Sequence, residues 1–186
     1  HDAALLRPSA GSVILGETDL TGLPPNRRAG AGLAIVPQGR QIFPKLTVQE
    51  NLLVGLQARN DRCRTIPEEV YDLFPILKTM GKRMGGDLSG GMQQQLAIAR
   101  ALVGQPKVLL LDEPTEGIQP NIIQEIGQVL HDLVDQRGMT VVLVEQYLDF
   151  VREFGHEFYV MDRGQVVAEG ATSELTSEIV SSHLTV

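Results

Sequence analysis

The chain has 186 residues, of which 42% are hydrophobic, and it carries a formal net charge of −7 and one cysteine, Cys63. A chain of this length can bury a core as one domain, with room for a small inserted lobe. The negative charge disfavours binding to nucleic acid, because such binding needs clustered Lys and Arg side chains to displace counterions. A single cysteine permits neither an internal disulfide nor a thiolate metal cage. The four histidines (His1, His131, His156 and His183) are scattered without the spacing of a metal site, so we expect them at the surface.

No apolar run approaches the roughly 18 to 20 residues that span a bilayer, and the first residues have neither the basic flank nor the apolar stretch of a secretion signal. We therefore expect a cytoplasmic protein without direct membrane insertion. Any contact with a membrane should run through a protein partner.

Hydrophobic spacing and turn residues predict strands alternating with helices. Residues 12–16 and 33–38 are predicted as strands, with a stretch rich in turn residues between them. Residues 47–82 place apolar side chains at helical spacing and are predicted as a helical insert. A helix is then predicted from Ser89 through Val103, ending at Gly104 and Pro106.

The second half of the chain reads as strand, helix, strand. Residues 107–112 form an apolar run, a helix is predicted to begin at Pro120, and residues 140–145 form the next strand. This order predicts a parallel sheet. Residues 158–170 are predicted as a hairpin that turns near Arg163 and Gly164, and residues 172–182 as a C-terminal helix.

Two acidic residues end the apolar strand of residues 107–112. Asp112 and Glu113 fall at a carboxyl strand end, which is where open parallel sheets keep their ligand crevices. Asp112 is placed to hold a magnesium ion, directly or through water, while Glu113 can polarise a water that attacks a terminal phosphate. Taken alone, an Asp-Glu pair at this place is also typical of a turn or a helix cap.

A serine and two glycines stand before the helix that starts near residue 90. Ser89, Gly90 and Gly91 offer a hydroxyl and exposed backbone N–H groups at the positive end of the helix, which suits a phosphate oxygen. The alternative is a serine N-cap with a flexible entry to the helix.

The run LSGGMQQQLAIARAL followed by PKVLLLDEPT closely resembles the signature and Walker B segments of ABC ATPases, and the resemblance covers nearly the whole chain. It implies an α/β fold: a P-loop NTPase-like core with a mostly parallel sheet and an inserted helical subdomain. Residues 1–38 and 101–186 would form the core, and residues 39–100 the helical signature subdomain. ATP and magnesium are the implied cofactors. Gln38 would be the Q-loop glutamine that senses magnesium and the attacking water, although by itself it could simply end a turn.

The wording EGIQP and VEQYLDF resembles the urea-type subunit within the branched-chain amino acid importer group. The implied function is to couple ATP binding and hydrolysis to uptake of urea or branched-chain amino acids. The implied partners are a second ABC ATPase subunit, packed head to tail, and transmembrane permease subunits at the inner face of the cell membrane. Residues 40–46 are the expected permease-docking surface, with Phe43 expected in the core.

Two features depart from the family pattern. No GxxxxGK[ST] occurs in residues 1–186, so we expect an N-terminal truncation that removes this phosphate loop and the first strands of the sheet. Gln146 stands where most ABC ATPases have a histidine; a glutamine can donate a hydrogen bond to a phosphate but cannot carry a proton charge, and it could also cap the following helix. The chain alone is therefore expected to be inactive as an ATPase while lending Ser89, Gly90 and Gly91 to a complete partner.

Two further functions stay open at this point. The chain could be a catalytically dead binding half of an asymmetric ATPase pair. It could also be a non-transport ABC ATPase of DNA repair or translation, although such proteins usually have long insertions or tandem domains. The transported solute cannot be read from an ATPase subunit, which never touches it.

Overall fold

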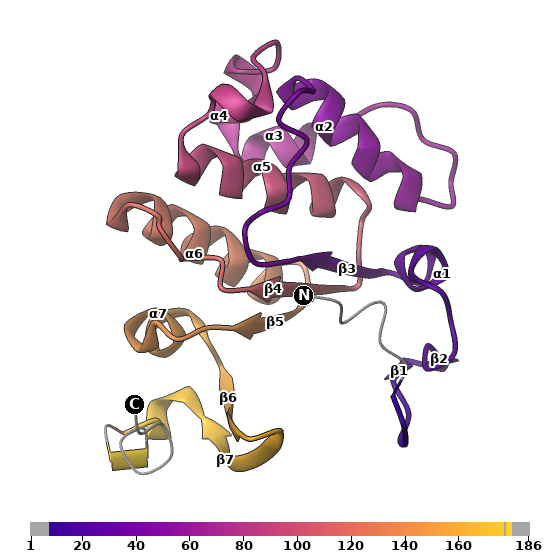
Figure 1. Cartoon of the computed structure of the whole chain (residues 1–186). Helices are drawn as coiled ribbons and strands as arrows, with labels where there is room; N and C mark the ends of the chain where they lie inside the picture. Colours follow the sequence, from indigo (N-terminus) through magenta and orange to yellow (C-terminus); the bar gives the residue numbers. More distant parts are fainter. Residues whose placement is uncertain (1–7, 177, 180–186) are drawn as a thin grey trace.

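The fold is a small parallel sheet covered by helices on one side, with a short hairpin at each end of the chain (Figure 1). The computed structural model describes residues 8–176 and 178–179. The strands are β1 (Ile14–Leu15), β2 (Thr18–Asp19), β3 (Leu33–Val36), β4 (Val108–Asp112), β5 (Thr140–Val144), β6 (Glu157–Asp162) and β7 (Gln165–Ala171).

The helices are α1 (Pro25–Gly30), α2 (Val48–Gly55), α3 (Glu68–Leu73), α4 (Pro75–Thr79), α5 (Gly90–Val103), α6 (Pro120–Asp135) and α7 (Leu148–Phe154), with the short 3-10 turns η1 (Leu56–Ala58), η2 (Gly85–Asp87) and η3 (Thr172–Glu174). Helix α1 precedes β3, the helices α2 to α5 lie between β3 and β4, and α6 and α7 follow β4. In the part of the chain that the structure describes, no helix is long and apolar enough to cross a membrane.

The central sheet confirms the predicted parallel arrangement. Its strand order is β3-β4-β5, and both pairs are parallel, with Leu33 opposite Val108 and Asp112 opposite Val144. The central strand β4 turns Leu109 into the core, where it is fully buried. Because all three strands run in the same direction, their carboxyl ends meet at one edge of the sheet.

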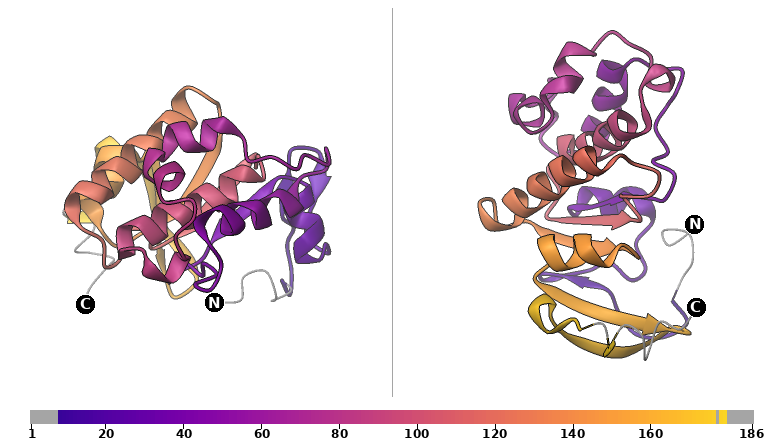
Figure 2. Two further views of the ribbon diagram at one scale, coloured as in Figure 1. Left: turned by 90° about the horizontal axis from the view of Figure 1, so that it is seen from above. Right: turned by 90° about the vertical axis from the view of Figure 1, so that its left-hand side faces the viewer.

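One face of this sheet lies under α5 and α6, and α2, α3 and α4 pack on α5 further from the sheet (Figure 2). Helix α5 is almost fully buried because its apolar residues face both the sheet and the helices α2, α3 and α4. Gly55 lets α2 approach α5 closely: a Cβ at this position would lie 2.2 Å from the carbonyl oxygen of Arg100. One continuous core therefore joins the helical insert to the sheet.

Several boundaries differ from the sequence-based expectation. The turn-rich stretch after β1 contains strand β2 and helix α1, which begins at Pro25 and is too short to show a periodic apolar pattern. The expected division between residues 100 and 101 lies within helix α5, and the division into core and helical subdomain stays a prediction. Of the predicted C-terminal helix at residues 172–182, Thr172–Glu174 form a 3-10 turn, and much of the remainder lies outside the described residues.

The hairpin of β6 and β7 is confirmed. Asp162 lies opposite Gln165, so Arg163 and Gly164 form a two-residue turn, and both have positive φ values of 45° and 79°. This is the geometry of a tight turn whose twist matches that of the strands it connects.

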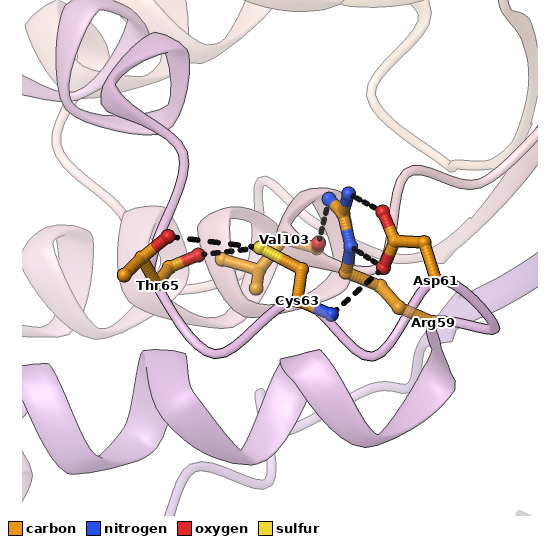
Figure 3. A network of polar contacts seen from close by, with 5 residues as sticks. All are labelled: Arg59, Asp61, Cys63, Thr65 and Val103. Carbon is orange, nitrogen blue, oxygen red and sulfur yellow. Dashed lines mark hydrogen bonds and ion pairs between the residues drawn. The ribbon is translucent and has the colours of Figure 1, made fainter.

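The polar linker between η1 and α3 is tied to the end of α5 (Figure 3). Arg59 forms an ion pair with Asp61 and also donates a hydrogen bond to the carbonyl oxygen of Val103 at 3.4 Å. The hydrogen bond from Arg59 lowers the pKa of Asp61 from 3.8 to about 2. Cys63 is a free, half-buried thiol that donates to the carbonyl oxygen of Thr65 at 3.3 Å. These contacts anchor the loop locally.

Candidate functional site

Three side chains converge where the strands of the parallel sheet end. Gln38 follows β3, Glu113 follows β4 and Gln146 follows β5. Nε2 of Gln38 donates to Oε2 of Glu113 at 2.8 Å, and Nε2 of Gln146 donates to Oε1 of Glu113 at 2.6 Å. Each carboxylate oxygen of Glu113 is therefore held by one amide group, so the orientation of the carboxylate is set from both sides.

The backbone explains why Glu113 turns inward at this point. Its N–H donates to the carbonyl oxygen of Val144 at 2.8 Å, which extends the pairing of β4 and β5 by one residue. The next step requires a left-handed conformation, because Glu113 has a φ of 45°. A residue other than glycine rarely adopts this region, and such strain tends to occur at functional sites.

A second carboxylate lies beside the first. Glu116 accepts a hydrogen bond from Nε2 of Gln38 at 3.1 Å. Arg40 donates to the carbonyl oxygen of Glu116 at 3.3 Å, and a Cβ at Gly117 would lie 3.7 Å from the same guanidinium nitrogen. The loop after β4 is thus linked to the loop after β3 through both side chains and backbone.

Glu145 organises the loop after β5 and was not singled out by the sequence patterns. Its Oε1 accepts from the backbone N–H of Thr115 at 2.9 Å and from the hydroxyl of Thr115 at 2.5 Å. Its Oε2 accepts from the backbone N–H groups of Gln146 at 2.9 Å and Tyr147 at 3.1 Å. Glu145 therefore clamps the loops that present Glu113 and Gln146. The sequence signal that could have identified Glu145 is its position as a charged residue directly after an apolar strand.

Asp112 is the last residue of β4 and is half-buried beside Glu113. Together with the amide oxygen of Gln38, its carboxylate supplies oxygen donors, which are the ligands that magnesium prefers. The side chains at this edge of the sheet therefore fit a magnesium ion by their chemistry.

Ser89, Gly90 and Gly91 lie at the start of α5. Oγ of Ser89 accepts a hydrogen bond from the backbone N–H of Met92 at 3.3 Å, so the serine N-cap is present. Gly91 is buried, and a Cβ there would lie 2.9 Å from Cγ2 of Ile122, so packing against α6 also requires a small residue. The helix N-terminus with its glycines is formed as expected, and its phosphate-binding role stays a prediction.

Arg40 connects this helix N-terminus with the carboxylate cluster. A Cβ at Gly90 would lie 3.2 Å from Nη2 of Arg40, the same atom that donates to the carbonyl oxygen of Glu116. The helix start and the strand ends therefore flank one guanidinium group. Arg40 has a positive φ of 66°, which shows that the loop is bent sharply to place it there.

Gln146 does not cap the helix that follows it. Helix α7 begins after Tyr147 and has no side-chain N-cap, while the amide of Gln146 points to Glu113. The expectation that Phe43 lies in the core is wrong: its side chain is 45% exposed, with the guanidinium of Arg100 5.1 Å from the ring centroid.

Comparison with known proteins gives the class of this fold and site. The family described as "ABC transporter" matches residues 3–116. Among solved structures, the ADP conformation of an ATP-binding cassette from an ABC transporter superposes with a TM-score of 0.78 at 27% identity, covering 98% of this chain and 80% of that one. The chain belongs to the ATP-binding subunits of the ABC transporter family.

The relatives of this chain belong to more than one kind of transport system. The branched-chain amino acid transport ATP-binding protein BraG of Pseudomonas aeruginosa is 40% identical over 160 residues, which are 86% of this chain and 68% of BraG. The probable branched-chain amino acid transport protein LivF of Archaeoglobus fulgidus is 36% identical over 89% of this chain and 71% of LivF. The lipopolysaccharide export protein LptB of Haemophilus influenzae is 31% identical over 94% of this chain and 73% of LptB.

Proposed function

We propose that the chain acts as an ATP-binding subunit that couples ATP binding and hydrolysis to solute uptake, at the inner face of a cell membrane and in contact with permease subunits. The observation that supports this most directly is the carboxylate of Glu113, oriented by Gln38 and Gln146. The names of BraG and LivF support branched-chain amino acids as the solute class. Other relatives are named for import of 2-aminoethylphosphonate or Fe(3+) ions, and none of these names points to urea.

In the proposed reaction Glu113 is the general base. Its two oxygens already accept from amides, and each has a further lone pair that can take a hydrogen bond from water. Gln38 and Gln146 keep the carboxylate aimed and contribute no proton of their own at neutral pH. Asp112 and Gln38 would hold magnesium. When bound, this ion supplies positive charge that offsets the negative charge of the phosphate oxygens.

The proposed nucleotide site is shared between two subunits. Residues 1–186 contain no GxxxxGK[ST], so a lysine-bearing phosphate loop has to come from another segment or chain. Ser89, Gly90 and Gly91 at the start of α5 would complete the partner's nucleotide site with N–H groups and the positive helix end. Solved cassettes of this family include one described as dimeric and one described as dimeric and bound to ADP and Pi.

Equilibrium binding of a fluorescent ATP analogue with magnesium tests the shared site. The chain is measured alone and with a lysine-bearing ABC ATPase as partner, and Ser89→Ala is measured beside the unaltered chain. We expect binding only with the partner, weakened by Ser89→Ala. Tight binding by the isolated chain would show a phosphate site elsewhere in these residues and refute the shared arrangement.

Turnover by the assembled transporter ATPase tests the base. Glu113→Gln should lower the rate by about 10²- to 10⁴-fold, the usual contribution of a general base. Glu116→Gln is the matched control, because Glu116 also accepts from Gln38 but lies further along the exposed loop. Equal losses in the two variants, or a Glu113→Gln variant with normal turnover, would reject Glu113 as the base.

A further inference from the structure

A second group of ligand-type side chains lies at the opposite edge of the sheet. His131, Asp135 and His156 each offer one nitrogen or oxygen atom, and these atoms all lie within 4.8 Å of one another. Helix α6 starts at the carboxyl end of β4 and returns the chain to the start of β5, so its last turn lies away from Glu113. The sequence positions predicted scattered surface histidines, and the fold instead brings two of them to one carboxylate.

Two of the three side chains are neighbours by helix geometry. His131 and Asp135 are one turn apart on α6, so they project from the same face. Nδ1 of His131 lies 3.4 Å from Oδ2 of Asp135. A histidine and a carboxylate at this spacing can supply two ligands to one metal ion without any change of the backbone.

The third side chain is delivered by close packing of α7 on α6. A Cβ at Gly127 would lie 2.3 Å from the ring of Phe154, so only glycine permits this approach without a shift. Gly127 is one turn before His131, and Phe154 is two residues before His156. The helix contact therefore places His156 over the same face of α6 as His131, and Nε2 of His156 lies 3.3 Å from Oδ1 of Asp135.

The backbone that carries His156 is held in place. Thr172 donates its backbone N–H to the carbonyl oxygen of His156 at 3.0 Å and its hydroxyl to the carbonyl oxygen of Gly155 at 2.6 Å. Thr172 itself is only 9% exposed. The imidazole thus projects from a fixed point, and only its side-chain torsions need to adjust when a ligand binds.

The distances suit a small transition-metal ion. Zinc bonds to nitrogen and oxygen of about 2.0–2.2 Å, in a tetrahedral arrangement, put neighbouring ligand atoms about 3.3–3.6 Å apart. The separations of 3.3 Å and 3.4 Å are close to that spacing, and they run to the two different oxygens of Asp135, so a turn of this carboxylate would bring both imidazoles next to one shared oxygen. Two imidazoles and one carboxylate are also a donor set that zinc accepts, and the three side chains are 37%, 46% and 54% exposed, which leaves room for a water ligand.

The local charge also favours a cation. The C-terminal turn of α6 contains Asp132 and Asp135 and has no basic residue, although the helix dipole places negative charge at this end. Arg137, two residues beyond the helix, pairs with Glu69 at 3.1 Å. We propose that His131, Asp135 and His156 form a binding site for a divalent transition-metal ion such as Zn²⁺, which would pin the end of α6 to the junction of α7 and β6.

Isothermal titration of the whole chain with Zn²⁺ at pH 7.5, in a preparation without a polyhistidine tag, tests the site. His131→Ala, His156→Ala and Asp135→Asn should each weaken the affinity on the order of tenfold or more, since even outer-shell partners contribute that much. Asp132→Asn is the matched control, because it removes the same charge from the same turn but no proposed ligand; its Oδ1 accepts from Gln128. Equal losses for Asp132→Asn and Asp135→Asn would reduce the effect to general charge and overturn the site.

A second measurement on the unaltered chain does not depend on how the variants fold. Zn²⁺ at about 100 times its dissociation constant should raise the melting temperature by about 5 to 10 °C if it binds only the folded chain. The imidazole nitrogens of both histidines should shift together in the NMR spectrum as Zn²⁺ is added. Unshifted resonances with bound Zn²⁺ would place the ion elsewhere. Absence of Zn²⁺ binding would also reject the proposal.

Discussion

Asn51 offers the sharpest test of how the loop after Gln38 is held. Its side chain is fully buried and joins α2 to the preceding loop by four hydrogen bonds. Oδ1 accepts from the backbone N–H of Phe43 at 2.8 Å, while Nδ2 donates to the carbonyl oxygens of Phe43 at 3.0 Å, Leu46 at 3.2 Å and Thr47 at 2.9 Å. One amide group thus links both Phe43 and Leu46 of this loop to helix α2.

The expected size follows from these contacts. A neutral hydrogen bond contributes about 1 kcal/mol net, and a buried polar group left without a partner costs about 1–3 kcal/mol. The better helix propensity of alanine offsets about 0.5 kcal/mol of this loss of stability. We therefore expect Asn51→Ala to lower the free energy of unfolding by about 2–4 kcal/mol, measured by urea denaturation with an unchanged slope.

Asn51→Asp separates hydrogen bonding from packing. It keeps the shape and the acceptor for Phe43 but turns the donor into an oxygen that faces three carbonyl oxygens. It should therefore destabilise the chain more than Asn51→Ala. Gln49→Ala on the same helix is the control, because the Gln49 side chain is exposed. A loss below about 1 kcal/mol for Asn51→Ala, or an Asp variant as stable as the Ala variant, would refute the reasoning.

Three other changes test other parts of the fold. Glu145→Ala removes a carboxylate that accepts four hydrogen bonds, and it should lower the free energy of unfolding, measured by urea denaturation, by about 2–4 kcal/mol. Glu145→Gln should lose less stability, because it keeps one acceptor oxygen. Gly55→Ala should lower it by about 1–2 kcal/mol despite better helix propensity, because the new Cβ would press on the Arg100 carbonyl oxygen. The depressed pKa of Asp61, about 2 through the hydrogen bond from Arg59, contributes stability that is present above pH 4 and lost as the pH falls towards 2; an NMR titration of Asp61 checks this.

Each of these has an outcome that contradicts it. Gly22→Ala meets open space and should leave stability nearly unchanged, so an equal loss there would mean that the Gly55 effect is not steric. A Glu145→Ala variant of normal stability would show that water replaces the carboxylate. An Asp61 that titrates near pH 4 would show that its ion pair does not persist in solution.

The sequence by itself determined the local elements and the class of protein. Apolar runs of four residues identified the three parallel strands, and the LSGG and LLLDEPT motifs identified the family, because propensity, periodicity and motif spacing act over short stretches of chain. The end of the strand 107–112 pointed to Glu113, and the resemblance to the family named Gln38 and Gln146. These local signals missed α1 and β2, which are too short to carry a period.

Only the tertiary structure decided which of these residues meet. Gln38 and Glu113 are 75 positions apart, and Gln146 is 33 positions further on, so their hydrogen bonds depend on the register of parallel strands. The pairing of His156 with Asp135 depends likewise on how closely α7 packs against α6. Such contacts arise from the fit of buried faces over the whole core, and no short segment of the chain encodes that fit.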